Sequence, residues 1–124
     1  MKRDYRHYIL DILDSIKAIE SFVEGYAFED FAKDRKTVDA IIRNLEIIGE
    51  AAKNVPKDIK KKYGEIPWKE MAGMRDKLIH EYHGVDLEII WKVVVERLPT
   101  IRPFFEKIAE EMKNETFSYN SSST

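Results

Sequence analysis

The residues whose types and spacing suit chemistry are concentrated in the segment RDKLIHEYHG, which spans residues 75–84. It holds an arginine, two histidines and a tyrosine, whereas Leu78 and Ile79 are its only aliphatic residues. A guanidinium can grip a phosphate through its planar fork of donors, and an imidazole can move a proton near neutral pH. The segment is therefore either a solvated helix face or a reactive site.

The spacing of these residues limits what a single helix can do. Each helical residue turns about 100°, so Tyr82 returns nearly to the line of Arg75, whereas His80 lies about 140° away from it. An unbroken helix would not point Arg75 and His80 at one small target. Asp76 precedes His80 by four residues, a spacing at which a carboxylate can meet an imidazole and favour its charged form.

Three interpretations of this segment compete. A metal site formed by His80 and His83 would need more ligands, and HEYH is not the HExxH pattern of a zinc protease. A charged surface helix, with Tyr82 packed and its neighbours solvated, is the ordinary structural alternative. In the third, His80 moves a proton while Arg75 holds a phosphodiester and stabilises the charge that develops on it.

Two acidic residues interrupt an otherwise aliphatic segment further upstream. Glu46 and Glu50 lie one turn apart, a spacing that suits acid–base chemistry or a divalent cation. No third acidic partner occurs at helical spacing. A structural role, in which both carboxylates meet an arginine or lysine of a neighbouring helix, is therefore favoured.

The net charge of −2 conceals an uneven distribution along the chain. Residues 53–77 hold 8 Lys/Arg against 4 Asp/Glu, whereas the segments on either side each have a net charge of −3. The basic segment includes Lys60, Lys61 and Lys62 in a row, just ahead of the polar cluster. These lysines form either a solvated turn or a patch that attracts phosphates.

The elements that must position these residues are helices. Apolar residues recur at three- and four-residue steps over 5–23, 38–52, 87–98 and 101–112, which is the pattern of one buried helix face. No segment shows the alternation of apolar and polar residues that is typical of a strand outside this helical pattern. The sequence predicts an all-α protein, an antiparallel bundle of four to five helices over residues 1–114, followed by a flexible polar tail over 115–124.

Several residues predict where the helices begin and end. Gly25 lies at an expected helix stop, and Asp34 or Thr37 can cap the helix that follows. Pro67 suits the first turn of the helix that carries the cluster. Pro99 either kinks the last helix or starts a new one.

Composition excludes other classes of protein. The chain has no cysteine, which rules out disulfides and thiolate metal sites. Its N-terminal residues lack an unbroken apolar run, so we expect neither a signal peptide nor a membrane anchor. A cytoplasmic location is expected by elimination.

The combined motifs resemble a known family. The pattern Arg75-x4-His80-x-Tyr82 matches the RX4HXY signature of the HEPN superfamily, specifically its small HepT-like toxins. RNLEIIGEAA (43–52) is similar to the second-helix signature of that branch, and residues 66–86 resemble its central segment.

The resemblance implies an all-helical homodimer that cleaves RNA without a metal or other cofactor. It implies that Arg75 and His80 are catalytic and that Asp76 occupies a supporting polar position. The motif helices of two copies would face each other, which would let both residue types converge on one phosphate. The expected chemistry is attack by a ribose 2′-hydroxyl, and the basic segment with Lys60, Lys61 and Lys62 would contact the RNA.

The same resemblance implies a partner and a means of control. Relatives are encoded beside a minimal nucleotidyltransferase antitoxin, which adenylylates the tyrosine that corresponds to Tyr82. That modification would place bulk and negative charge in the cleft. The alternative is a non-catalytic helical partner or scaffold of the nucleotidyltransferase, since an intact motif does not prove turnover.

Overall fold

The computed structural model describes residues 4–80 and 86–122, and the side chains of 4–77 and 86–114. The chain folds into helices, and no strand occurs within those ranges. The elements in chain order are α1 (Tyr5–Phe22), α2 (Phe28–Lys33), α3 (Arg35–Asn54), α4 (Lys57–Lys62), α5 (Trp68–His80), α6 (Leu87–Lys92), the π-helical turn η2 (Val93–Arg97) and α7 (Leu98–Ser122).

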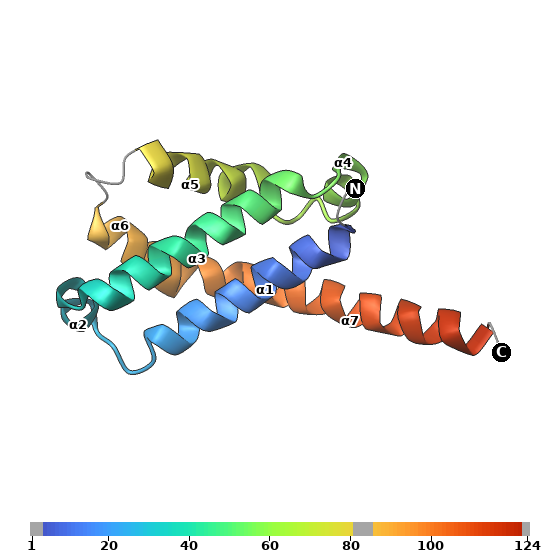
Figure 1. Ribbon diagram of the computed structural model, residues 1–124, viewed down its shortest axis with the longest axis horizontal. Coiled ribbons are helices and arrows are strands. Elements are labelled where there is room, and N and C mark those ends of the chain that lie inside the picture. Colours follow the sequence, from blue (N-terminus) through green and yellow to red (C-terminus); the bar gives the residue numbers. More distant parts are fainter. Residues whose placement is uncertain (1–3, 81–85, 123–124) are drawn as a thin grey trace.

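The long helices run antiparallel to one another, and α3 packs against both α1 and α5 (Figure 1). The helix formed by α6, η2 and α7 closes the bundle, with α7 packed against α1. These observations confirm the predicted all-α class and antiparallel bundle. No helix in the described part of the chain is long and apolar enough to cross a membrane.

The core is built from the apolar faces that the periodicity predicted. Four isoleucines of α1 are fully buried, and α3 and α7 supply the facing side chains. Burial of such side chains is the main favourable contribution to folding. Members of this core with less than 2% exposure include Ile9, Ile12, Ile16, Ile19, Ile41, Leu45, Ile48, Phe105 and Ile108.

Side-chain caps fix the starts of two helices. The Asp34 carboxylate accepts a hydrogen bond from the Thr37 backbone N–H at 3.2 Å, so Asp34 rather than Thr37 caps α3. Asp86 caps α6 through the backbone N–H of Glu88 at 2.8 Å. Each cap satisfies a backbone donor that has no partner inside the helix.

An aromatic contact anchors the start of α5, the helix that carries the polar cluster. The Trp68 ring meets the Phe105 ring of α7 edge-on, with 5.6 Å between centroids. Its indole N–H also donates to the Tyr63 carbonyl oxygen at 3.1 Å. Pro67 immediately precedes α5, and its carbonyl oxygen accepts from the Met71 N–H at 3.0 Å. The first turn of α5 is thus held by the contacts of Trp68 with Phe105 and Tyr63 and by the backbone hydrogen bond from Met71 to Pro67.

Two features differ from the expectation based on sequence. The short helix α2 was not anticipated, although its Phe31 is fully buried and lies 5.2 Å from the Trp91 ring centroid. The backbone of α7 is helical through Ser122, so it includes residues 115–122 of the predicted tail, whose flexibility stays a prediction. Those residues contain no glycine or proline to stop a helix that is already formed. Pro99 is the second residue of α7, which continues without a break from the π-helical turn η2, so it does not start a separate helix.

Candidate active site

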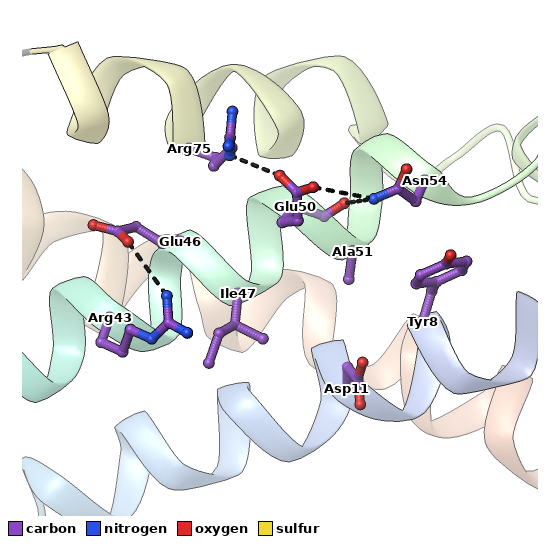
Figure 2. Close-up of a pocket in the computed structure, with 9 residues that line it drawn as sticks. All are labelled: Tyr8, Asp11, Arg43, Glu46, Ile47, Glu50, Ala51, Asn54 and Arg75. Carbon is purple, nitrogen blue, oxygen red and sulfur yellow. Dashed lines mark hydrogen bonds and ion pairs between the residues drawn. The ribbon is translucent and has the colours of Figure 1, made fainter. Parts of the chain in front are cut away.

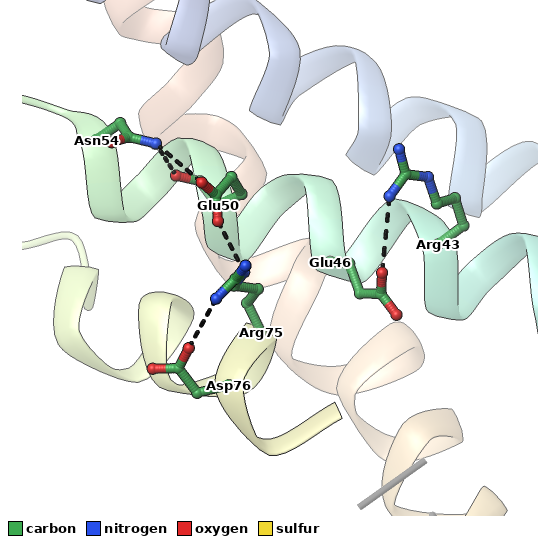
Figure 3. Close-up of polar contacts among 6 residues, drawn as sticks. All are labelled: Arg43, Glu46, Glu50, Asn54, Arg75 and Asp76. Atoms are coloured by element: carbon green, nitrogen blue, oxygen red, sulfur yellow. Dashed lines mark hydrogen bonds and ion pairs between the residues drawn. The ribbon is translucent and has the colours of Figure 1, made fainter. Parts of the chain in front are cut away.

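Arg75 lies in α5, and two carboxylates hold its guanidinium (Figure 3). Nε of Arg75 lies 2.7 Å from Oε2 of Glu50, which comes from α3. Nη1 of Arg75 donates to Oδ1 of Asp76 at 3.1 Å. The arginine side chain is 30% exposed, whereas both carboxylate side chains are 52% exposed. The group is therefore oriented by its partners and still reachable from solvent.

Gly49 allows α3 and α5 to approach closely at this point. A Cβ atom added there would lie 2.3 Å from Cβ of Arg75, 2.9 Å from its backbone nitrogen and 3.0 Å from the carbonyl oxygen of Met71. Only glycine leaves room for that separation. The two motif segments, 43–52 and 75–84, thus meet at the glycine of one and the arginine of the other.

Arg75 faces a groove of about 530 Å³ between α1, α3 and α5 (Figure 2). The walls of the groove combine charged and polar side chains with the apolar Ile47 and Ala51, which suits a ligand that has both polar and apolar parts. Its charged or hydrogen-bonding lining residues are Tyr8 and Asp11 from α1, Arg43, Glu46, Glu50 and Asn54 from α3, and Arg75 from α5.

The carboxylates of Glu46 and Glu50 on α3 pair with different arginines. Glu50 meets an arginine of the neighbouring helix, which confirms the structural role predicted for it. Glu46 instead lies 3.7 Å from Nη1 of Arg43, three residues earlier on its own helix, so the prediction was wrong for that residue. No cluster of three metal-ligating side chains occurs among the described residues, so a divalent-cation site at Glu46 and Glu50 lacks its third ligand there.

The remaining residues of the motif are described only in part. His80 ends α5, and its side chain lies outside the described part of the structure. Tyr82 and His83 lie outside the described residues altogether. Asp76 contacts Arg75, and its predicted contact with His80 stays a prediction.

The predicted RNA-contacting lysines lie on α4, which follows the C-terminal end of α3. Lys60 donates to the carbonyl oxygen of Lys53 at 3.3 Å, Lys61 is exposed, and the Lys62 ammonium lies 5.3 Å from the Tyr63 ring centroid. None of these three lysines lines the groove at Arg75. α4 lies at the end of the bundle where α5 begins (Figure 1). His80 is about 18 Å further along that helix, since each helical residue rises 1.5 Å.

Sequence reasoning missed the roles of Gly49 and Arg43. A glycine inside a helical pattern costs about 1 kcal/mol relative to alanine, which is a signal of close packing. Gly49 therefore could have been recognised from its position in RNLEIIGEAA. Arg43 gave no comparable signal, because a single arginine on a helix is ordinarily a solvated residue.

Comparison with known proteins identifies close relatives. The family model described as ribonuclease HepT-like matches residues 12–108. A Thermococcus cleftensis protein named "Probable ribonuclease HepT" is 54% identical over 108 residues, which are 87% of this chain and 98% of the relative. The Methanocaldococcus jannaschii protein "Putative RNase MJ0127" is 46% identical over 114 residues, covering 92% of this chain and 94% of the relative.

A longer relative contains a similar segment as one part of its chain. This Methanocaldococcus jannaschii protein is named "Gamma-glutamylcyclotransferase and putative RNase MJ0434". It is 45% identical over 121 residues, which are 97% of this chain and 54% of the relative. No solved structure matches the chain.

Proposed function

The chain belongs to the ribonuclease HepT-like family, and from that membership we propose that it is a metal-independent endoribonuclease, the toxin of a toxin–antitoxin pair. The names of its relatives support ribonuclease activity. The observation that carries the proposal is the placement of Arg75. Its guanidinium is oriented by Glu50 and Asp76 at the wall of the groove between α1, α3 and α5, and its side chain stays 30% exposed.

The proposed reaction is an internal transesterification of RNA. A ribose 2′-oxygen attacks the adjacent phosphorus, and the bond from phosphorus to the leaving 5′-oxygen breaks. His80 assists by accepting the 2′-hydroxyl proton, and a proton is delivered to the leaving oxygen. The products are a 2′,3′-cyclic phosphate end and a 5′-hydroxyl end. Arg75 stabilises the negative charge that builds on the phosphate oxygens.

Assembly of two copies is part of the proposal. Arg75 and His80 are five residues apart on α5, and helical geometry separates them by about 140°. One copy alone would therefore direct them to different places. In a homodimer with the two α5 helices facing each other, the Arg75 of one copy and the His80 of the other can approach the same phosphate from two sides.

Control by a partner completes the proposed function. A cognate minimal nucleotidyltransferase would transfer an adenylyl group to the hydroxyl of Tyr82. The added phosphate carries negative charge and would repel an RNA phosphate near Arg75. Modification would thereby switch off cleavage without unfolding the bundle.

The test is RNA cleavage by purified, unmodified protein in the presence of EDTA. Arg75→Ala and His80→Ala variants, each shown to be folded, are compared with the wild type. We expect cleavage by the wild type alone, with 2′,3′-cyclic phosphate ends, because both groups act on the same step. A substrate with a 2′-deoxyribose at the cleavage site should remain intact.

Other outcomes would contradict the proposal. Equal and negligible cleavage by all three proteins, with mass spectrometry showing unmodified Tyr82, would favour a non-catalytic partner of the nucleotidyltransferase. Loss of wild-type activity in EDTA, with recovery on adding a divalent cation, would contradict metal independence.

A further inference from the structure

We propose that Glu50 is a positioning residue for Arg75, holding Nε so that the outer end of the guanidinium is directed at the scissile phosphate. This inference rests on the proposed function and deepens it. The two side chains come from different helices, α3 and α5, and meet at 2.7 Å across the contact at Gly49 (Figure 3).

The pattern of contacts leaves part of the guanidinium available. Its five N–H donors comprise one on Nε and two on each terminal nitrogen. Glu50 forms an ion pair with Nε, and Asp76 accepts a hydrogen bond from Nη1. No other described side chain is recorded as a partner of Arg75. The second Nη1 hydrogen and the two Nη2 hydrogens can therefore meet two oxygens of a phosphate end-on.

Glu50 is better placed than Asp76 to fix this orientation. Asp76 follows Arg75 on the same helix and moves with it, whereas Glu50 ties the guanidinium to a second helix. Asn54 supports Glu50, since its Nδ2 donates to the Glu50 carbonyl oxygen at 2.9 Å and lies 3.4 Å from Oε1. The carboxylate is thus held on its own helix while it holds the arginine.

Because the ion pair of Glu50 and Arg75 is exposed, removing Glu50 should affect the position of Arg75 much more than the stability of the fold. An ion pair with a partner that is 52% exposed contributes little to folding, because solvent screens it. Losing Glu50 should therefore leave the bundle folded. It would, however, free the Arg75 guanidinium to rotate away from the reacting phosphate, and a misplacement of about 1 Å can cost about a hundredfold in rate.

A second ion pair of the same protein provides the matched control. Glu70 of α5 is also 52% exposed and lies 3.1 Å from Nη2 of Arg97. It is not among the residues that line the groove at Arg75. Glu50→Ala and Glu70→Ala remove the same chemical group, and the two carboxylate side chains are equally exposed, although Arg97 is 64% exposed and Arg75 only 30%.

The first experiment measures kcat and KM for RNA cleavage by the wild type, Glu50→Ala, Glu50→Gln and Glu70→Ala, with urea unfolding of each. We expect Glu50→Ala to lower kcat about ten- to a hundredfold, with a smaller change in KM. Glu50→Gln should recover part of the loss, because its amide oxygen can still lie against Nε although the negative charge is gone. Glu70→Ala should keep the wild-type kcat and lose as little stability as Glu50→Ala.

The second experiment reports on Arg75 without requiring activity. The Nε–H signal of Arg75 is followed by nitrogen-15 NMR, and its assignment is checked with Arg75→Lys. We expect a slowly exchanging signal in the wild type and in Glu70→Ala, and fast exchange in Glu50→Ala, because the carboxylate that lies 2.7 Å from Nε and shields it from solvent is gone.

The outcomes separate this inference from the proposed function. Active wild type with equal kcat values for Glu50→Ala and Glu70→Ala would overturn the positioning role. If the wild type does not cleave RNA, the proposed function fails. The NMR signal then tests by itself whether Glu50 holds the Arg75 guanidinium in place. An Nε–H signal that Glu50→Ala leaves unchanged would overturn the positioning role, whereas its loss would support a role for Glu50 in fixing Arg75.

Discussion

At the scale of single residues, the protein keeps Arg75 both oriented and accessible. Two carboxylates at 2.7 and 3.1 Å offset its charge and restrict its rotation, yet its side chain remains 30% exposed. Arginine suits this arrangement because its planar fork can meet one partner along its side and another at its end. A lysine has a single ammonium and could not satisfy both geometries.

Acid should weaken the cap of α3, because the capping carboxylate of Asp34 becomes protonated. One substitution at Asp34 can isolate this effect on stability. Hydrogen bonds from the Tyr26 hydroxyl at 2.6 Å and from Thr37 hold the pKa of Asp34 below its ordinary value of 3.8. A carboxyl whose pKa is lowered by folding stabilises the protein above its unfolded pKa. That stability is lost as the pH falls through the lowered pKa of the folded state.

We therefore expect Asp34→Asn to reduce the dependence of stability on acid pH. Asparagine still caps a helix but carries no charge to lose, so the variant isolates the titration. Urea unfolding followed by circular dichroism at pH 7 and below pH 4 tests this prediction. Equal losses of stability on acidification in wild type and variant would contradict it.

At the scale of elements, the contact between α3 and α5 gives opposite predictions for two glycines. A Cβ at Gly49 would collide with Arg75 and with the Met71 carbonyl oxygen, whereas one at Gly73 of α5 meets nothing within 4 Å. Gly49→Ala should destabilise the protein by about 1–3 kcal/mol through overpacking. Gly73→Ala should stabilise it by up to about 1 kcal/mol, since alanine is the better helix former.

The measurement is the free energy of unfolding in urea for both variants, at one pH and one temperature. Because each replaces a helical glycine by alanine, the difference between them isolates the helix–helix contact. Changes of the same sign and size would show that α3 and α5 do not pack as closely as described.

Sequence patterns predicted the long helices but not every element between them. The faces of α1 and α3 follow a sustained apolar repeat, which only a helix can bury on one side. The helix α2 has six residues, too few for a period to show, and its Phe31 is buried by tertiary contact with Trp91. The π-helical turn η2 ends two residues before Pro99, which lacks the N–H for a helical hydrogen bond to Val95, so the sequence indicates a disturbance there but not its form.

The sequence predicted which residues belong to the candidate site better than it predicted how they contact one another. The motif identified Arg75, and the paired carboxylates drew attention to Glu50. Their contact depends on which helices become neighbours and on how closely they pack, which is a property of the whole fold. For the same reason, the positions of the α4 lysines in the chain did not show that they are not among the residues lining the groove.

At the scale of the whole molecule, the proposed dimer makes a prediction that a monomeric site does not. An Arg75→Ala subunit retains His80, and a His80→Ala subunit retains Arg75. If each site takes one residue from each copy, mixed dimers of the two inactive variants contain one complete site. Random pairing of equal amounts should then restore about a quarter of wild-type cleavage, since half of the dimers are mixed.

The measurement is RNA cleavage after the two variants are unfolded together and refolded, with each variant treated alone as the control. Dimer formation is checked by analytical ultracentrifugation. No recovery in a sample that contains mixed dimers would indicate that Arg75 and His80 of the same copy act together.

The contact at Gly49 also limits how this chain can change through mutation. Any other residue adds a Cβ that meets the backbone of α5, so a single codon change there would move Arg75 without altering a charged residue. If the proposed toxin function is correct, such a change would lower RNA cleavage by displacing Arg75, although every charged residue is kept. Replacement of Gly49 would therefore affect both the packing of α3 against α5 and the position of Arg75.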